Sequence, residues 1–322
     1  MSRQTACNRT RRICMAKKKN EQKILLLTDS ASDISDADLQ ESGVIMLPIP
    51  ITIDGKGYFE RVDFTTEEFY ERLAAAKELP STSHILPLTY QQSYQDAFEA
   101  GYTDIINVTI TSAGSSMFQA AVSAKKMFFE ETPEAQGKLN ITVLDSGSYT
   151  FGYGYPLMEA SKMVKAGKSS AEIIDYLEDF FSTVEIYFAA YSLEYAKKSG
   201  RIPAAAAFVG DMLGLRPVIS IIDGKTAVVE KVRGDKNVVT HIVEHAFAHC
   251  VDKKAPTAIV YGSVEQYGED MWKAAAKKFG HAPKMKFRAG ASIAINSGPK
   301  VVGMIVRGEK RFHTRACEKD YL

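Results

Sequence analysis

Residues 104–121 read "DIINVTITSAGSSMFQAA", and this stretch holds the strand, loop and helix that decide the fold. Its apolar start, "DIINVTI", is typical of a strand buried on both faces of a parallel sheet. Five hydroxyl side chains lie between Thr109 and Ser116, around Gly114, and a helix is predicted from about Ser116 to Glu130. Ligands of open parallel sheets bind beyond the carboxyl ends of the strands. The hydroxyl loop therefore lies where a ligand site is expected.

Two other predicted strands of the first half end in similar polar segments. The run "KILLLTDS" (23–30) leads into a short helix at 33–43, and "NITVLDSGS" (140–148) leads through a glycine-rich segment into a helix from about Pro156. Strands that alternate with helices predict a parallel sheet flanked by helices. Because the carboxyl ends of parallel strands meet at one edge, we expect the three loops to converge on one site.

The segments between these strands carry their own local signals. Residues 44–53 are predicted as a second strand with a bend, and 54–58 as a hairpin turn. Thr65 followed by Glu68 is a capping pattern that opens a helix at 65–80. Residues 81–83, "STS", are interpreted as a hydroxyl-rich loop before another helix, because no strand is evident ahead of them.

The second half of the chain has a different character, typical of a mixed α/β domain. A hairpin is predicted around Asp223-Gly224, because Asp-Gly is a favoured two-residue turn between strands. The predicted strands are 184–193, 216–233, 257–264, 283–290 and 301–308.

The chain of 322 residues is long enough for two α/β domains. We predict an N-terminal parallel-sheet domain and a C-terminal mixed α/β domain between two tails. The boundaries are 1–22 for a disordered basic tail, 23–160 and 161–314 for the domains, and 315–322 for the last tail. The basic tail lacks the apolar core of a secretory signal. Met15 is a second plausible start, so we expect residues 1–14 to be an extension.

Composition excludes several classes of function. Hydrophobic residues make up 45% and charged residues 25%, and the formal net charge is +1. A nearly neutral chain does not favour a nucleic-acid partner, and no apolar run approaches the roughly 20 residues that span a bilayer. The four cysteines form no CxxC pair, which is typical of reduced thiols. We therefore expect a cytoplasmic protein without stable membrane insertion.

The hydroxyl loop does not match the motifs of nucleotide binding or serine hydrolysis. A phosphate-binding P-loop needs GxxxxGK[ST], a dinucleotide fingerprint needs GxGxxG, and a nucleophile elbow needs GxSxG. None of these follows the strands of this chain. The loop also contains no Lys or Arg, so it suits one carboxylate better than a triphosphate. A single helix cap would explain Ser115 or Ser116, but not the second cluster at 81–83.

Two groups of residues raise a metal as an alternative. Asp29 and Asp145 each follow a strand and could bind a divalent metal, although turn and cap chemistry explains both more simply. His241, His245 and His249 lie on one predicted helix face beside Cys250, but no HExxH or second ligand cluster accompanies them. We expect no metal site, and a metal-dependent enzyme that uses the two aspartates on a small phosphorylated or carboxylated substrate stays open as the alternative.

The order of the motifs resembles the DegV family, bacterial fatty-acid-binding proteins that include the binding subunit of fatty acid kinase. The resemblance runs from about Lys23 to Val306. Its most specific stretch is "SLEYAKKSGRIPAAAAFVGDMLGLRPVISIIDGKTAVVEKVRG" (192–234). The other motifs are "LTDSASDI" (27–34), "VIMLPIPITIDGKGY" (44–58), "FYERL" (69–73), "PSTS" (80–83), "ITSAGSSMFQAA" (110–121), "VLDSGS" (143–148) and "NSGPKVVGM" (296–304).

The resemblance implies a lipid-binding protein that is not itself an enzyme and needs no cofactor or metal. A long-chain fatty acid would lie between and within the two domains, and a separate ATP-dependent kinase would phosphorylate its carboxylate. The hydroxyls implied to hold the carboxylate are those of Thr82, Ser83, Ser115 and Ser112. Arg201, Arg233 and Asn296 are implied to lie near the head group or the partner.

Three departures from the family pattern bear on that implied role. Ser116 and Met117 stand where the family has Gly and Thr, and "SHIL" (83–86) stands where it has Ser-Gln-Pro-Ser. Asn296 stands where the family has a histidine, and asparagine does not titrate near neutral pH. The sequence therefore leaves open whether the chain presents its lipid to a kinase, acts mainly as a docking module for one, or binds lipid without a kinase.

Overall fold

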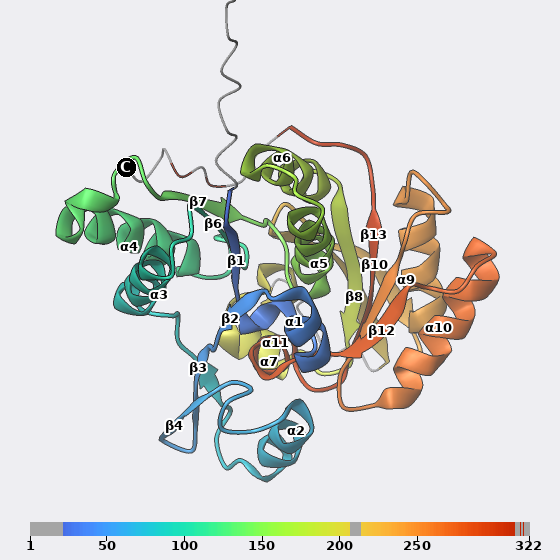
Figure 1. The fold of residues 1–322 in the computed structure, drawn as a ribbon. Helices are drawn as coiled ribbons and strands as arrows, with labels where there is room; N and C mark the ends of the chain where they lie inside the picture. Colours follow the sequence, from blue (N-terminus) through green and yellow to red (C-terminus); the bar gives the residue numbers. More distant parts are fainter. Residues whose placement is uncertain (1–21, 207–213, 313–315, 317, 319–322) are drawn as a thin grey trace, which may run out of the picture.

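The computed structural model describes residues 22–206, 214–312, 316 and 318. The predictions for residues 1–21, and for most of 315–322, fall outside these residues. The described chain forms two large sheets and one small one, with helices packed around them (Figure 1). None of the helices in the described segments is long and apolar enough to cross a membrane.

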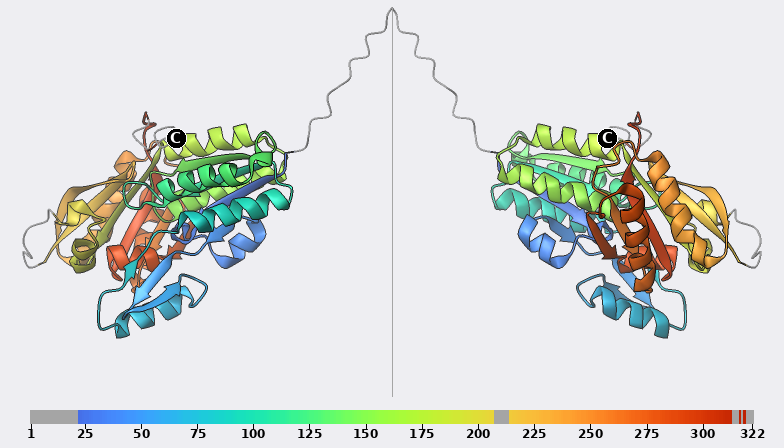
Figure 2. Two further views of the ribbon diagram at one scale, coloured as in Figure 1. Left: turned by 90° about the vertical axis from the view of Figure 1, so that its left-hand side faces the viewer. Right: turned by 90° about the vertical axis from the view of Figure 1, so that its right-hand side faces the viewer.

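The first sheet is parallel, with the strand order β2-β1-β6-β7. Its strands are β1 (Ile24–Asp29), β2 (Ile45–Leu47), β6 (Asp104–Thr109) and β7 (Asn140–Asp145). Every residue of β1 and β6 is buried, because helices cover both faces (Figure 2). Helices α3 (Pro87–Glu99) and α4 (Met117–Glu131) cover one face, and α5 (Phe151–Lys165) and α6 (Ser170–Phe181) cover the other. The predicted parallel sheet is confirmed.

Short elements at the edge of this sheet have slightly different bounds from those predicted. The turn η1 (Ser30–Ser32) comes directly after β1, so helix α1 (Asp36–Ser42) starts later than predicted. Ser35 caps α1 through the backbone N–H of Asp38, and Gly43 ends it at φ 74°. A second short turn, η2 (Pro133–Ala135), follows α4.

Helix α5 corrects the prediction for the glycine-rich segment, because it starts at Phe151 and not near Pro156. Gly154 lies so close to η1 that an added Cβ would be 2.3 Å from the carbonyl oxygen of Ser32. The glycines therefore permit close helix packing here and do not mark a break. Tertiary contact outweighs the low helix propensity of glycine, which is worth only about 1 kcal/mol.

A separate antiparallel sheet replaces the single bent strand predicted at 44–53. The chain leaves β2 at Leu47 and forms β3 (Pro50–Ile53), which pairs with β4 (Lys56–Phe59) and β5 (Ser81–Thr82). The hydroxyl segment predicted as a loop at 81–83 thus begins as an edge strand. Helix α2 (Thr66–Ala75) starts at the predicted capping box of Thr65 and Glu68.

The second large sheet is mixed, in the order β10-β9-β8-β13-β11-β12. The predicted hairpin at Asp223-Gly224 joins β9 and β10. The bounds are β8 (Val184–Ala190), β9 (Leu215–Ile222), β10 (Lys225–Arg233), β11 (Ala258–Tyr261), β12 (Met285–Arg288) and β13 (Val301–Arg307). Helices α9 (Asp235–His249) and α10 (Glu265–Phe279) cover one face.

The inner face of this sheet shares a core with the first sheet. Along β8, Ile186 and Phe188 join the core that also contains Leu27 of β1, whereas Tyr187 and Ala189 pack toward α9 and α10. This alternation is the period-2 pattern of a strand between two apolar layers. The domain boundary predicted at residue 160 lies inside α5 and stays a prediction.

Three short helices fill the space beside the shared core. They are α7 (Glu194–Ser199), α8 (Pro203–Ala206) and α11 (Ala291–Ser297). Helix α11 belongs to the second half of the chain, yet it contacts η1, α2 and β5 of the first half as well as α7. It therefore joins the two halves next to the carboxyl edge of the first sheet (Figure 1).

Candidate functional site

A cavity of about 490 Å³ lies between the carboxyl edge of the first sheet and the inner face of the second. One wall comes from the loops after β1, β6 and β7, through Ala31, Gly114–Met117 and Tyr149-Thr150, and the hydroxyls of these loops make it polar. The predicted convergence of three strand-end loops is confirmed. Its apolar wall includes Ile186, Phe188, Ile221 and Val260 of the second sheet. A pocket of this kind, mostly apolar with a few polar groups, is typical of a small-molecule site.

The structure separates the residues that the sequence grouped together. Thr82, Ser83, Ser115, Arg201 and Asn296 all line the cavity. Ser112 and Arg233 do not. The Ser112 hydroxyl and backbone N–H both donate to the Asp145 carboxylate. Arg233 is exposed at the end of β10.

The loop after β6 presents Ser115 to the cavity. Its Oγ accepts a weak hydrogen bond of 3.4 Å from the backbone N–H of Met117, which leaves the hydroxyl proton to donate to a ligand. Ser116 is the N-cap residue of α4 but makes no side-chain cap hydrogen bond. Ser116 and Met117, which depart from the DegV pattern, also line the cavity. Ser115 is therefore the hydroxyl of this loop that is best placed for an anion.

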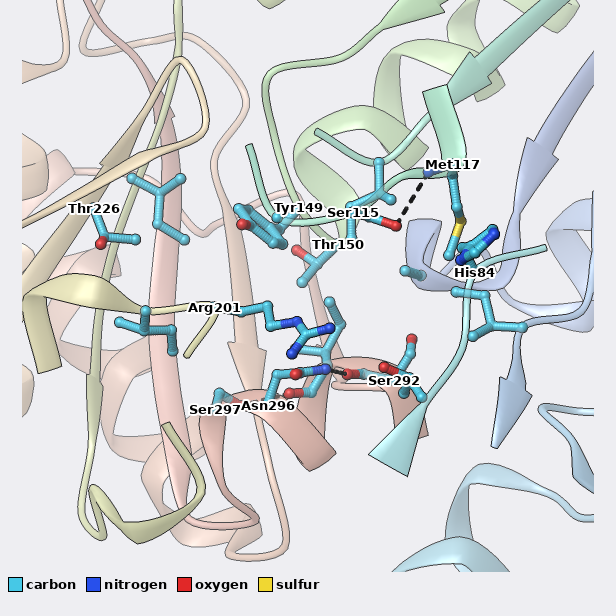
Figure 3. A pocket seen from close by; sticks show the side chains of 18 of the residues that line it. His84, Ser115, Met117, Tyr149, Thr150, Arg201, Thr226, Ser292, Asn296 and Ser297 are labelled. Carbon is cyan, nitrogen blue, oxygen red and sulfur yellow. Dashed lines mark hydrogen bonds between the residues drawn. The ribbon is translucent and has the colours of Figure 1, made fainter. Parts of the chain in front are cut away.

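Arg201 brings a positive charge to the cavity, whose hydroxyl loop contains no Lys or Arg. Helix α7 ends at Gly200, whose φ of 68° is the left-handed conformation that glycine adopts readily. Arg201 then donates through Nη1 to the carbonyl of Ser199 at 2.6 Å. Figure 3 shows its guanidinium group directed into the cavity near Asn296 and Ser292. Of the lining residues in the described chain, it is the one Lys or Arg.

Asn296 lines the cavity from α11, and its side chain is already engaged. Its Nδ2 donates to the carbonyl of Ser292, 2.6 Å away, one turn earlier in the same helix. The side-chain oxygen is then the group left for other partners. The asparagine therefore supplies an uncharged polar group to the site, with no titration near neutral pH.

The sequence analysis missed six polar lining residues: His84, Tyr149, Thr150, Thr226, Ser292 and Ser297. The Thr150 and Ser292 side chains are buried, and their hydroxyl oxygens have no hydrogen-bond partner within the described structure. Thr150 directly follows the polar segment after β7, which is a signal that sequence reasoning could have used. Ser292 gives no such signal, because only the packing of α11 brings it to the cavity.

Thr150 has a strained backbone as well as an unpartnered hydroxyl. Its φ of 52° and ψ of −140° place it second in a turn that the Gly152 N–H closes on the Tyr149 carbonyl at 3.0 Å. That conformation corresponds to the first central position of a type II′ turn, which favours glycine. A β-branched residue at positive φ is costly and is found mainly at functional sites.

We expect Thr150→Gly to raise the free energy of unfolding by about 1 kcal/mol, because strain of 1–3 kcal/mol is relieved against the entropy cost of glycine. Urea denaturation measures this change in the free energy of unfolding. The affinity for a ligand should fall in the same variant, because the Thr150 hydroxyl is lost. Thr150→Ser is the control that keeps both strain and hydroxyl. A glycine variant less stable than the wild type would contradict the strain argument.

The aspartates of the metal alternative are each held by donors from the protein. Asp29 accepts from the Tyr153 hydroxyl at 2.6 Å, from the Ile110 N–H at 2.9 Å and from the Ala31 N–H at 3.1 Å. Burial raises the pKa of Asp29 to about 6. Asp145 accepts from Ser112 and from the Gly147 N–H, and strand β6 lies between the two carboxylates. Across the residues that can be described, no group of three or more His, Cys, Asp or Glu is arranged to hold a metal ion.

The histidines of α9 bind carboxylates of the neighbouring sheet. His241 and His245 both contact Glu230 at 2.9 Å, and His249 lies 3.6 Å from Glu185. Cys250 is a buried free cysteine. The row of histidines is thus explained by contacts between α9 and carboxylates of the strands it covers.

Comparison with known proteins shows which family this chain belongs to. A family model described as "uncharacterised protein, DegV family" matches residues 23–309. The chain belongs to the DegV family. A DegV domain-containing protein of Clostridium perfringens is 30% identical over 291 residues, covering 89% of this chain and 99% of the relative. A second, from Caldanaerobacter subterraneus, is 27% identical over 284 residues, covering 88% of this chain and 98% of the relative.

Solved DegV structures share the fold and are described by their ligands. A fatty acid (stearic acid)-binding protein of Eubacterium ventriosum has a TM-score of 0.78 at 25% identity, covering 89% of this chain and 98% of that one. A fatty-acid-binding DegV family protein of Streptococcus agalactiae has a TM-score of 0.79 at 26% identity, covering 89% of this chain and 99% of that one. The DegV chain described here therefore has the two-sheet fold of proteins described as fatty-acid binders.

Proposed function

We propose that this DegV protein binds a long-chain fatty acid in the cavity between its two sheets. The observation that carries the proposal is the division of the cavity into a polar wall of hydroxyls with one cation and an apolar wall from the second sheet. The solved relatives described as fatty-acid binding support it. Burying an acyl chain is worth roughly 0.8 kcal/mol per CH₂ before ordering costs.

The proposed carboxylate site combines hydroxyls from both halves of the chain. Ser115, Thr82 and Ser83 come from the first half and line the cavity, as the family resemblance implied. Arg201 and Ser292 come from the second half, and Figure 3 shows them on the opposite side of the cavity from Ser115. Hydrogen bonds to a charged acceptor contribute about 1.5–3 kcal/mol each.

One cation and several neutral donors match one carboxylate better than a phosphate. A phosphate carries up to two charges and is ordinarily bound by helix N-termini with Lys or several Arg side chains. Among the described lining residues, only Arg201 is of that kind. The site therefore favours a carboxylate over the phosphorylated substrate of the metal-dependent alternative. We accordingly propose a lipid-binding protein that is not itself an enzyme.

We further propose that the bound carboxylate can be presented to an ATP-dependent fatty acid kinase in the cytoplasm. Arg201 supports this, because it is exposed and also lines the cavity, so it can contact both the lipid and a partner. The phosphorylation rate of lipid-loaded protein with a purified fatty acid kinase tests the step. Arg201→Ala should slow phosphorylation while stearic acid remains bound. An unchanged rate would contradict this role for Arg201.

The decisive experiment measures lipid directly. Native mass spectrometry of the purified protein is expected to show a bound fatty acid, and the delipidated protein is expected to bind stearic acid in a calorimetric titration. A protein that carries no lipid and binds no stearic acid after delipidation would overturn the proposal.

Ser115→Ala and Ser112→Ala form a matched pair within one loop. Ser115→Ala should weaken stearic acid binding by about 10-fold, because a hydrogen bond to the carboxylate is lost. Ser112→Ala should leave the affinity within about twofold of the wild type, since its hydroxyl donates to Asp145 outside the cavity. Calorimetry gives both dissociation constants. Equal losses in the two variants would contradict the assignment of Ser115.

A further inference from the structure

The phenol of Tyr149 lies in the cavity wall without a hydrogen-bond partner. Its hydroxyl oxygen is buried and unpaired within the described structure, and burial raises the pKa of this phenol to about 12, so it stays a donor at neutral pH. Gly114 makes room for it, because a Cβ at that position would lie 2.2 Å from the hydroxyl oxygen. Figure 3 shows the hydroxyl on the side of Thr226, away from the Ser115 hydroxyl.

Tyr149 thus adds a polar group beyond the proposed carboxylate site. On that side the wall includes Ile221, which pairs across the sheet with both Ile186 and Thr226. Thr226 is the second hydroxyl of this region, and its Oγ accepts from the Ala204 N–H at 3.3 Å. The Thr226 proton is then available for a ligand oxygen. Two hydroxyl-bearing residues consequently line the cavity beside the aliphatic side chains of Ile186 and Ile221.

An alkyl chain cannot satisfy these donors. A buried polar group without a partner costs about 1–3 kcal/mol, and a saturated acyl chain drawn past Tyr149 would leave that cost in place. A ligand oxygen at the same level would remove it. The free-energy difference between a chain with an oxygen at this level and a chain without one is larger than the usual difference between two aliphatic chains. It can therefore set the selectivity of the cavity for its ligand.

We propose that the cavity selects acyl chains that carry an oxygen, namely hydroxy fatty acids, over the matching saturated acids. Tyr149 donates a hydrogen bond to the chain hydroxyl, and Thr226 provides a second contact farther along. Ser115 and Arg201 hold the carboxylate as before, so this inference rests on the proposed fatty-acid function. It adds a second polar subsite, specific for oxygen in the chain, to the carboxylate site.

The test compares stearic acid with 3-, 10- and 12-hydroxystearic acid by calorimetry, in the wild type and in Tyr149→Phe. The readout is the ratio of the stearic to the hydroxystearic dissociation constant. For at least one positional isomer this ratio should fall about 10-fold in Tyr149→Phe, the equivalent of about 1.4 kcal/mol. Tyr149→Phe should bind stearic acid at least as tightly as the wild type, which shows that the variant is folded.

Thr226→Val provides an independent variant, with a smaller expected fall in the same ratio. If all ratios in both variants stay within twofold of the wild type, the oxygen subsite is overturned, and the phenol is hydrated by water only. In that case stearic acid still binds, so the proposed function stands. If no fatty acid binds the wild type, the proposed function fails together with the subsite.

Discussion

Asp33→Asn is expected to stabilise the protein at pH 8, whereas Asp29→Asn is expected to destabilise it. Both carboxylates are buried at the carboxyl end of β1, and they lie four residues apart. They differ in what surrounds them. Asp29 receives three hydrogen-bond donors, but only the Oδ1 atom of Asp33 receives one, from the Gly290 N–H at 2.9 Å.

The second oxygen of Asp33 is the source of the expected stabilisation. Oδ2 is buried without a hydrogen-bond partner in the described chain, and a Cβ on Gly290 would lie within 3 Å of both an Asp33 and a Glu60 carboxylate oxygen. Burial first, and the Glu60 charge second, raise the pKa of Asp33 well above its ordinary value. Asparagine imitates the protonated form and can keep the bond from Gly290.

The sign of the pH dependence follows from proton binding. Below the ordinary pKa near 4, the folded and unfolded states both hold the Asp33 proton, so it contributes nothing to the pH dependence. Above that value the unfolded state releases the proton and the folded state retains it. Stability therefore falls as pH rises toward the raised pKa. Asp33→Asn removes this loss, and we expect a gain of at least about 1 kcal/mol at pH 8 and little change at pH 4.

Asp29 has a raised pKa as well, but its surroundings do not suit an amide. The stability that Asp29 contributes is likewise lost as pH rises from about 4 to about 6, the pKa of Asp29 in the folded protein. Above about pH 6 its contribution no longer changes. An asparagine would turn an NH₂ group toward the Tyr153 hydroxyl or the Ile110 N–H, leaving donors unpaired. We expect Asp29→Asn to lower the free energy of unfolding at pH 8 by about 2–3 kcal/mol.

Urea unfolding at pH 4, 6 and 8 checks both variants against the wild type. Each variant is the control for the other, since the two changes are chemically identical. Stabilisation by Asp29→Asn, or destabilisation by Asp33→Asn that grows with pH, would show that the assignment of donors is wrong. A metal-dependent activity lost in Asp29→Asn would instead revive the enzyme alternative.

Ile221→Trp is expected to shorten the acyl chain that the protein accepts. Ile221 lines the cavity from β9, and its cross-strand neighbours Ile186 and Thr226 line it too. The larger ring should displace about two or three methylenes of a long chain, which costs about 2 kcal/mol or about 30-fold in affinity. Stearic acid should therefore bind about 30-fold more weakly, and lauric acid within about threefold of the wild type.

Val229→Trp is the matched control for this change. Val229 lies on the neighbouring strand β10, is 38% exposed and does not line the cavity. Its replacement should leave both affinities unchanged, and competition with a fluorescent fatty acid measures all of them. Equal weakening of stearic and lauric acid in Ile221→Trp would place the acyl chain elsewhere in the cavity.

The sequence by itself determined the features that depend on local chemistry. Three examples were predictable: the buried strand at 104–109, the capping box at Thr65 and the Asp223-Gly224 hairpin. Each rests on residues a few positions apart, whose backbone preferences and hydrogen bonds do not need the rest of the fold. The convergence of three polar loops followed too, because parallel strands bring their carboxyl ends to one edge.

Only the tertiary structure decided which polar groups share the cavity. It placed Ser115 in the cavity wall, whereas Ser112, three positions earlier in the same loop, bonds to Asp145. It also brought Ser292 and Arg201 from the second half of the chain to the cavity. It also made a helix of the segment around Gly154, which close packing on Ser32 favours. These outcomes depend on contacts between segments far apart, such as Asp33 with Gly290, 257 positions away. No local pattern encodes such contacts, because their energy comes from the partner segment.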